Sequence, residues 1–556
     1  MSTTIAVIGG VGLFLLGMSV MTGGLKAMAG ASLRTVLSKA AATPLSGVFW
    51  GAIVTLLVQS SSATTMTTIG LVSAGLLTFP QGLGLVFGAN IGTTGTGWLV
   101  ALIGVRVSLT SFALPLIFIG ALVKLLGRGR ISAAGASLAG FALVLFGLTT
   151  LQQGMGGLAE QLHPADLPAV TAAAGAGWWS GFLGVLILVI VGLVMTTLMQ
   201  SSTAAIAVTL SAFYAGAVGL DQACALIIGQ NIGTATSSAL AAIGASSTAK
   251  RLALAYILFK LIAAVIALVL FPVVTPLMVR ASNTIDGVSL LAAYHTAYNV
   301  VGVLVLLPIV DKFTKFVERL LPERGSLLTR CLDPAALAIP IAAIEAARRT
   351  VARALEAICG SINAQLESNN PGGAVRPGNA SMAEAADALR QTQEFIADVS
   401  GPPETEEDHR RLTSTLHALD HASRLAEAAS KDTDVGSGKD SPDNTRVTQL
   451  CADAMRNAAL VAAKVSQTGV HEGADAVAPA EGATLADGAL VQLENSAKAL
   501  KDAQPAYRTA TLGAVGSGGL TADEAIVRVD AARRLEMFAH HAWRCAAHLI
   551  GDGKQN

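Results

Sequence analysis

The sequence predicts an all-α polytopic membrane protein of two inverted repeats with re-entrant or broken helices, followed by a soluble antiparallel helical bundle. Three observations support this fold class: an uneven distribution of charge, long apolar segments, and polar motifs that recur at a fixed offset. Residues 1–310 hold 11 Lys and Arg and 4 Asp and Glu, whereas the rest of the chain holds 26 and 33. Only the first part is therefore apolar enough for a bilayer.

Six apolar segments in this first part are long enough, or nearly so, to cross a bilayer of roughly 30 Å. The first segment has no basic n-region and no small-residue cleavage site, so we expect it to remain as a membrane helix. We expect a multi-pass protein of the cell (inner) membrane with its C-terminal domain in the cytoplasm. The six segments are Thr4–Leu25, Val107–Leu126, Ala133–Leu151, Leu183–Met199, Leu252–Val274 and Val288–Val310.

A self-match at an offset of 141 residues indicates an internal duplication. Gln59–Ala63 (QSSSA) recurs as Gln200–Ala204 (QSSTA), and Gly88–Thr93 (GANIGT) recurs as Gly229–Thr234 (GQNIGT). The two copies share 16 of 44 ungapped positions. A shared apolar composition would not align two polar motifs in one frame, so we expect two structural repeats.

Basic residues in short loops set the orientation of the two copies. Clusters of Lys and Arg after the first helix, at 124–130 and at 250–251 are expected to face the cytoplasm, and the acidic segment after Leu151 is expected outside. The first helix and its repeat mate, residues 133–151, would then cross in opposite directions, as in an inverted repeat. The predicted domains are membrane repeat 1 (1–130), membrane repeat 2 with a final helix (131–315), a linker (316–334) and a cytoplasmic helical domain (335–556).

The two Gln-Ser-Ser motifs lie inside apolar stretches, where polar side chains are costly unless the backbone is broken and lines a cavity. We therefore predict a helix break at each motif, with both breaks near the bilayer midplane. Free N–H groups at a helix start, together with serine hydroxyls, suit an anion, and neutral oxygens suit sodium. The alternative is hydrogen bonding between helices alone. Two related breaks, each 31 residues ahead of an Asn-Ile-Gly-Thr, favour a binding site.

These motifs and the later stretch His295-Thr296-Ala297-Tyr298-Asn299 resemble the type II sodium-dependent phosphate cotransporter family over residues 5–310. The resemblance implies a symporter of inorganic phosphate that uses sodium as coupling ion, with no cofactor and no other metal. It implies phosphate binding by Ser60, Ser61, Ser62, Ser201, Ser202 and Thr203. It implies sodium binding by Gln59, Asn90, Thr93, Thr94, Gln200, Asn231, Thr234 and Thr236. The alternative function is a membrane-anchored phosphate sensor.

Three further residues are expected to modulate this site: Lys260, His295 and Asn299. The family often carries His and Asn in the helix that here contains Tyr256 and Lys260. Lys260 lies roughly 13 Å along that helix from Arg251, too deep to reach the interface easily. A charge facing the anion and a lysine paired with carbonyl groups both remain open. His295 is expected to be a packing histidine and not a proton relay.

The second part of the chain is expected to form an antiparallel helical bundle, because apolar residues recur there at helical spacing. Its layout and the stretch Leu416–His421 resemble the PhoU-like domains of bacterial family members, which implies a regulatory protein as partner; its acidity argues against nucleic acid. His417 and His421 could bind a metal, but we favour a solvated helix face. The cysteines show no paired spacing, and no catalytic motif indicates an enzyme. The predicted helices cover 335–368, 381–398, 405–431, 443–466 and 521–550.

Overall fold

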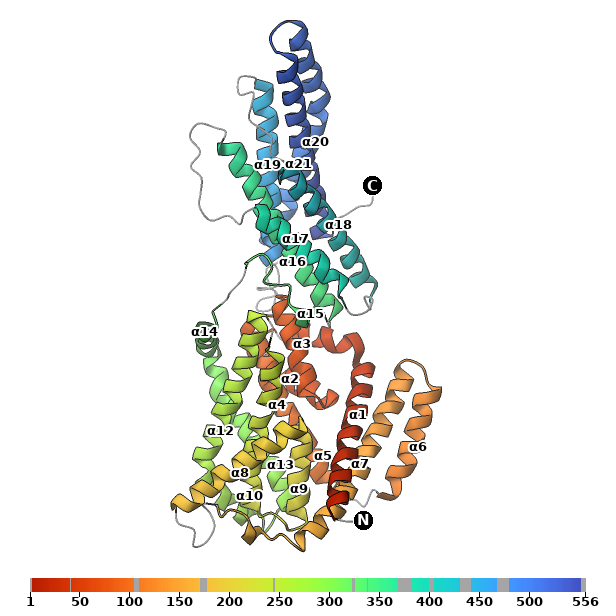
Figure 1. Ribbon diagram of the computed structural model, residues 1–556, viewed down its shortest axis with the longest axis vertical. Coiled ribbons are helices and arrows are strands. Elements are labelled where there is room, and N and C mark those ends of the chain that lie inside the picture. The colour runs from red at the N-terminus through yellow and green to blue at the C-terminus, as the bar shows by residue number, and fades with distance from the viewer. Residues whose placement is uncertain are drawn as a thin grey trace. The chain divides into compact units, whose positions relative to one another are not determined.

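The computed structural model divides the chain into two compact units. The N-terminal unit comprises Met1–Ile69 and Thr78–Glu323, and the C-terminal unit comprises Gly70–Leu77 and Arg324–Asn556. Every regular element in the described part of the chain is helical, which confirms the predicted all-α class (Figure 1). The structure describes residues 3–40, 42–104, 110–170, 178–243, 246–322, 326–337, 339–368, 382–399, 405–430, 442–467 and 480–551.

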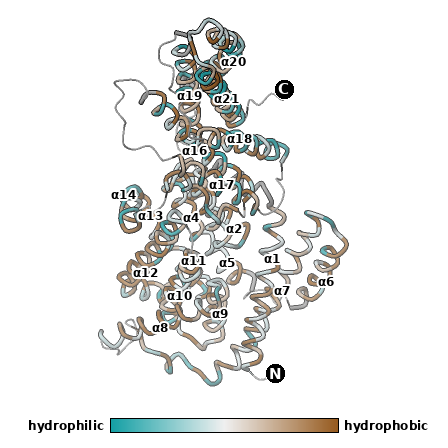
Figure 2. The backbone as a smooth tube through the Cα atoms, turned by 45° about the horizontal axis from the view of Figure 1, so that its top comes forward, coloured by the Kyte–Doolittle hydropathy of each residue, from teal (hydrophilic) through white to brown (hydrophobic). Residues whose placement is uncertain are grey.

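The N-terminal unit is a bundle of apolar helices, and five of them are long and apolar enough to cross a membrane. Their backbones are predominantly brown or white in Figure 2, the colours of apolar and intermediate residues. The chain is thus a polytopic membrane protein. The five candidate spans are Thr3–Ala29, Phe79–Leu102, Arg130–Ala159, Trp179–Met199 and Ser247–Ala281. The α-helices of this unit are α1 (Thr3–Ala40), α2 (Pro44–Val58), α3 (Ser61–Ser73), α4 (Phe79–Thr93), α5 (Gly95–Leu99), α6 (Thr110–Leu126), α7 (Arg130–Ala159), α8 (Trp178–Met199), α9 (Ser202–Tyr214), α10 (Leu220–Gly233), α11 (Ala235–Ala241), α12 (Ser247–Ala281), α13 (Gly287–Leu306) and α14 (Val310–Leu320).

Helices α1 and α7, the expected repeat mates, pack against each other in opposite directions. A Cβ added to Gly10 would lie 2.5 Å from the backbone nitrogen of Leu151, and one added to Gly24 would lie 2.4 Å from Oγ of Ser137. The contacting residue numbers in α7 fall as those in α1 rise, so the two helices are antiparallel. Small residues permit this close approach of two membrane helices.

The same type of helix pair occurs once in each repeat: α2 packs on α4, and α8 packs on α10. Gly88 of α4 and Gly229 of α10 make the closest approaches. A Cβ at these positions would lie 2.0 Å from the carbonyl oxygen of Val48 and 1.8 Å from that of Val189, respectively. Both the glycines and the carbonyl groups are related by the offset of 141. The duplication detected in the sequence is therefore also a duplication of helix packing.

The expected final span, Val288–Val310, is not one continuous helix. Helix α13 ends at Leu306, a 3-10 turn covers Leu307–Ile309, and α14 begins at Val310. Pro308 lies in this turn, and a proline ring lacks the N–H that a continuing α-helix needs.

The C-terminal unit is a bundle of long helices around small and aliphatic side chains. Leu355, Leu425, Met455 and Cys545 are fully buried there, and all five cysteines of the chain are unpaired. Its helices are α15 (Pro334–Leu337), α16 (Pro340–Ser368), α17 (Met382–Ala397), α18 (Glu406–Ser430), α19 (Pro442–Gln467), α20 (Ala480–Gly516) and α21 (Ala522–Ile550). Helix α20 was not among the predicted helices, because its many alanines and glycines and the internal Pro505 weaken the apolar periodicity.

Residues 70–77, the end of α3 and the turn after it, belong to the C-terminal unit. The hydroxyl of Ser73 donates a hydrogen bond to Oδ2 of Asp333 at 2.5 Å. Gly75 has a φ of 73°, and a Cβ added to it would lie 2.2 Å from Nη1 of Arg349. Ala74 is fully buried in a cluster with Cys331. The contiguous boundaries expected from the sequence do not contain this exchange.

Candidate functional site

Both Gln-Ser-Ser motifs break a helix in the same way. Helix α2 ends before Gln59 and α8 ends before Gln200, and these two glutamines have φ values of 56° and 51°. They are the non-glycine residues of the described chain that have positive φ. A residue with a Cβ destabilises this left-handed conformation by roughly 1–2 kcal/mol. Such strain is typical of functional sites.

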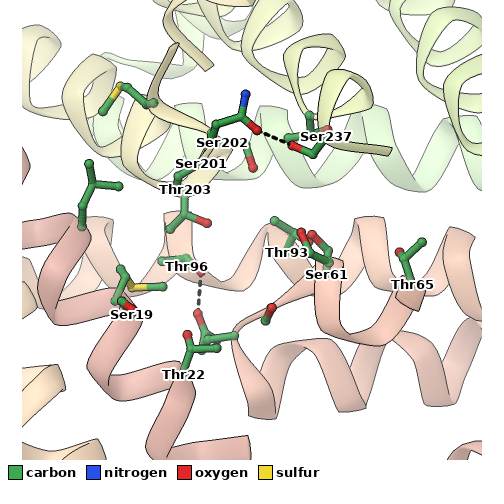
Figure 3. A pocket seen from close by; sticks show the side chains of 18 of the residues that line it. Ser19, Thr22, Ser61, Thr65, Thr93, Thr96, Ser201, Ser202, Thr203 and Ser237 are labelled. Carbon is green, nitrogen blue, oxygen red and sulfur yellow. Dashed lines mark hydrogen bonds between the residues drawn. The ribbon is translucent and has the colours of Figure 1, made fainter. Parts of the chain in front are cut away.

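The side chain of each glutamine is held by equivalent hydrogen bonds. Nε2 of Gln59 donates to the carbonyl of Leu56 at 2.5 Å, and Nε2 of Gln200 donates to that of Thr197 at 2.6 Å. Oε1 of Gln59 accepts from the Thr96 hydroxyl at 2.5 Å. Oε1 of Gln200 accepts from the Ser237 hydroxyl at 3.0 Å, as Figure 3 shows. Thr96 and Ser237 are again separated by 141 residues, so the whole arrangement is duplicated.

A new helix begins directly after each break. Oγ of Ser60 accepts a hydrogen bond from the backbone nitrogen of Ala63, and Oγ of Ser201 accepts one from that of Ala204, both at 3.2 Å. These serines cap α3 and α9. The first turn of a helix has unsatisfied N–H groups and the positive end of the helix dipole, which together favour an anion.

The two breaks line one cavity of about 490 Å³. In Figure 3, Ser61, Thr93 and Thr96 face Ser201, Ser202 and Thr203 across it, and Ser19 and Thr22 approach from α1. The lining residues that the structure describes include no Asp or Glu, and Lys26 is the one that carries a full charge. The cavity therefore presents hydroxyl and amide groups with a single cationic side chain.

The cavity brings together all six residues predicted to bind phosphate. Four of the eight predicted sodium ligands also line it: Gln59, Thr93, Gln200 and Thr234. The other four, Asn90, Thr94, Asn231 and Thr236, do not line it. The hydroxyls of Thr94 and Thr236 instead donate at 2.7 Å to carbonyl groups three residues earlier in their own helices.

Sequence reasoning missed several polar residues of the lining. Thr96 and Ser237 could have been found, because they match at the offset of 141. The residues contributed by α1 could not, since α1 meets the breaks only through tertiary packing. The missed polar residues are Ser19, Thr22, Lys26, Thr65, Thr96, Ser237, Ser238 and Tyr256.

The three expected modulators form a buried cluster behind this wall. The ammonium group of Lys260 donates to Oδ1 of Asn231, and Nδ2 of Asn231 donates to Oδ1 of Asn299 at 3.2 Å. Nδ2 of Asn299 donates to the carbonyl of His295 at 2.8 Å. Lys260 does not line the cavity, and its ammonium group lies 5.2 Å from the ring centroid of Tyr256, which does. This geometry agrees with the interpretation of Lys260 as paired at a helix interface.

His417 and His421 of the C-terminal unit do not form a simple solvated face. The ring of His421 is half-buried, and its Nδ1 lies 3.0 Å from Nδ1 of His541. His417 is exposed but stacks on His548 with 4.9 Å between ring centroids. No group of three or more His, Cys, Asp or Glu in the described residues is arranged to hold a metal ion.

Fold and cavity define a class of protein: a polytopic membrane transporter with a polar site between two duplicated helix breaks. The family is identified by comparison. Residues 13–153 and 184–292 match the Na+/Pi-cotransporter family, and the membrane part of the chain belongs to it.

Relatives from bacteria and animals share different parts of the chain. "Uncharacterized protein YqeW" of Bacillus subtilis is 28% identical over 311 residues, 56% of this chain and 96% of its own length. "Putative inorganic phosphate export protein YjbB" of Escherichia coli is 31% identical over 358 residues, and the match spans 63% of each protein. Human "Sodium-dependent phosphate transport protein 2B" is 47% identical over 62 residues, 11% of this chain and 9% of its own length. No solved structure matches the chain.

Proposed function

We propose that this protein is a sodium-coupled symporter of inorganic phosphate. The observation that supports this proposal most strongly is the meeting of both Gln-Ser-Ser breaks in one cavity without a lining carboxylate among the described residues. Phosphate is a compact anion that needs many hydrogen-bond donors. The starts of α3 and α9 offer backbone N–H groups, and the serine hydroxyls add more.

Sodium would use the neutral oxygens of the same cavity. The lining offers the amide oxygens of Gln59 and Gln200 and the hydroxyls of Thr93 and Thr234. The human relative is named for sodium-dependent phosphate transport, which supports this coupling by analogy. Anion and cation would then occupy one site, so each would strengthen binding of the other.

We further propose alternating access between two inverted repeats in the inner membrane. The antiparallel packing of α1 and α7 and the duplicated pairs α2/α4 and α8/α10 support this mechanism. The C-terminal unit would then lie in the cytoplasm, where a PhoU-like bundle could receive a regulatory protein.

Uptake of labelled phosphate into proteoliposomes tests the proposal. We expect uptake that depends on an inward sodium gradient and falls to background when potassium replaces sodium. Phosphate binding without any flux would instead support the alternative function, a membrane-anchored sensor. Flux that is independent of sodium would contradict the coupling.

The name of the Escherichia coli relative raises a second possibility, net export of phosphate. A symporter carries its substrates in the direction that the combined gradients favour, so export requires outwardly directed gradients. Proteoliposomes preloaded with labelled phosphate and sodium test this direction. Efflux that is accelerated by internal sodium would support export by the same site.

A further inference from the structure

A second polar cavity lies within the C-terminal unit, among α16, α18 and α21. Its volume is about 1140 Å³. Four arginines line it, namely Arg348, Arg410, Arg411 and Arg544, whereas Glu407 is the acidic residue of the described lining. The C-terminal part of the chain is acidic overall, so this concentration of positive charge is local and does not reflect composition.

Two of these arginines have no carboxylate partner. Arg410 and Arg544 form no ion pair with any described residue, although the guanidinium of Arg544 lies 5.7 Å from the ring centroid of Trp543. Arg411 pairs with Glu407 at 2.8 Å, which neutralises one charge only. The cavity therefore keeps a net positive charge that a bound anion would compensate.

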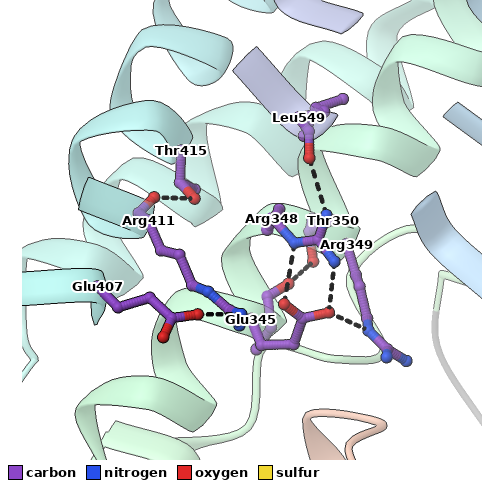
Figure 4. Close-up of polar contacts among 9 residues, drawn as sticks. Glu345, Arg348, Arg349, Thr350, Glu407, Arg411, Thr415 and Leu549 are labelled. Atoms are coloured by element: carbon purple, nitrogen blue, oxygen red, sulfur yellow. Dashed lines mark hydrogen bonds and ion pairs between the residues drawn. The ribbon is translucent and has the colours of Figure 1, made fainter. Parts of the chain in front are cut away.

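The arginine at the base of the cavity is held rigidly. In Figure 4, Arg348 donates to both carboxylate oxygens of Glu345, at 2.9 and 3.0 Å, and to the carbonyl of Leu549 at 2.8 Å. Glu345 also accepts from Arg349 at 2.8 Å. Because Arg348 is already ordered, an anion would need to order fewer side chains when it binds.

Histidines complete the wall. His548 is 9% exposed, and burial, Arg544 and His417 all lower its pKa. Arg544 also lowers the pKa values of His421 and His540, for which burial is the largest cause. One guanidinium thus acts on three imidazoles, which indicates a positive potential around it. Neutral imidazoles can still donate an N–H to an anion.

We propose that this cavity binds a soluble anion that carries two or more phosphate groups. Guanidinium groups bind phosphate oxygens in pairs, and four of them exceed what one phosphate needs. A long nucleic acid is disfavoured, because its backbone would extend from this pocket over an acidic surface. The proposal is independent of transport, since none of the lining residues belongs to the membrane cavity.

Calorimetric titration of the full-length protein in detergent, with tripolyphosphate as the probe, tests this site. The double variant Arg410→Ala/Arg544→Ala should bind tripolyphosphate at least about tenfold more weakly, which corresponds to about 1.4 kcal/mol. Arg424→Ala is the matched control, because Arg424 lies on the same helix α18, is exposed and pairs with Asp420 at 3.0 Å. Its affinity should equal that of the unaltered protein.

Two further measurements make the outcome decisive. Arg544→Lys keeps the charge but not the paired geometry, so an affinity between those of Arg544→Ala and the unaltered protein supports a guanidinium site. Orthophosphate should bind this site more weakly than tripolyphosphate in Ser202→Ala, a variant that alters the membrane cavity. Absence of tripolyphosphate binding, or equal weakening by Arg424→Ala, would overturn the proposal.

Discussion

Gln59 and Gln200 combine a strained backbone with a fully engaged side chain. Each amide group donates to its own helix and accepts from a hydroxyl that follows the Asn-Ile-Gly-Thr motif. The neighbouring serines cap the next helices, so the N–H groups of α3 and α9 are oriented before any substrate arrives. At the scale of single residues, the site is preorganised by local hydrogen bonds.

The first prediction concerns one serine of each break. Ser61→Ala and Ser202→Ala should each lower phosphate uptake by about tenfold or more, because each removes a donor from one half of the cavity. The proteins should fold normally, since neither hydroxyl caps a helix. Proteoliposome uptake and thermal unfolding of the same samples measure both effects. Normal transport by either variant would exclude a site shared by the two breaks.

A second prediction separates backbone strain from side-chain chemistry. Gln200→Gly keeps the left-handed conformation without a Cβ, so the protein should be as stable as before, or up to about 1 kcal/mol more stable. Its uptake should nevertheless fall strongly, because the amide that contacts Ser237 is lost. Gln153→Ala, on the exposed face of α7, is the control and should transport normally. Unchanged uptake by Gln200→Gly would refute a role for the amide.

At the scale of elements, the contacts within α2/α4 and α8/α10 position the breaks. Gly88 and Gly229 allow one backbone to touch the other, and the breaks follow directly at the ends of α2 and α8. The motifs around these glycines therefore contribute to packing as well as to polarity. Asn90 and Asn231 illustrate this, since their side chains are buried and do not line the cavity.

A third prediction follows from this packing. Gly229→Ala would place a Cβ 1.8 Å from the Val189 carbonyl oxygen, so α8 and α10 must separate. We expect a loss of about 1–3 kcal/mol in stability, seen as a lower unfolding temperature in detergent. Gly156→Ala in α7 is the control, because nothing lies within 4 Å of its added Cβ. Equal stability of the two variants would contradict the packing role.

Sequence reasoning reached the breaks because polar motifs in apolar helices have few structural solutions. It found the serines and glutamines of the cavity, and it found most helices of both units. It missed Ser19 and Lys26, whose place in the cavity depends on how α1 packs. It also missed α20, where alanine and glycine obscure the helical period. These features depend on tertiary contacts that local patterns do not encode.

At the scale of the whole molecule, charge balance links substrate and ions. The described lining of the membrane cavity has no carboxylate, so sodium would have to be compensated by phosphate itself. Our fourth prediction is nearly electroneutral transport, with two sodium ions for each divalent phosphate. Currents on a solid-supported membrane at saturating substrate should therefore be small. A substantial phosphate-induced current in sodium buffer would contradict this stoichiometry.

Lys26 is the charge that bears on this balance, because it lines the cavity and Lys260 does not. Lys26→Gln should weaken phosphate binding several-fold, since a cation near the anion is lost. Lys250→Gln, at an exposed position, should leave the affinity unchanged. Similar affinities for both variants would show that Lys26 does not contact the phosphate.

Helix α3 starts with Ser61 at the membrane cavity, and its last residues belong to the C-terminal unit. A helix shared in this way connects two binding equilibria thermodynamically. Any shift that phosphate causes in the free energy of residues 70–77 must return as an equal shift in phosphate affinity when those residues are perturbed. The hydrogen bond between Ser73 and Asp333 then becomes a gauge of cavity occupancy, readable as amide exchange far from the substrate.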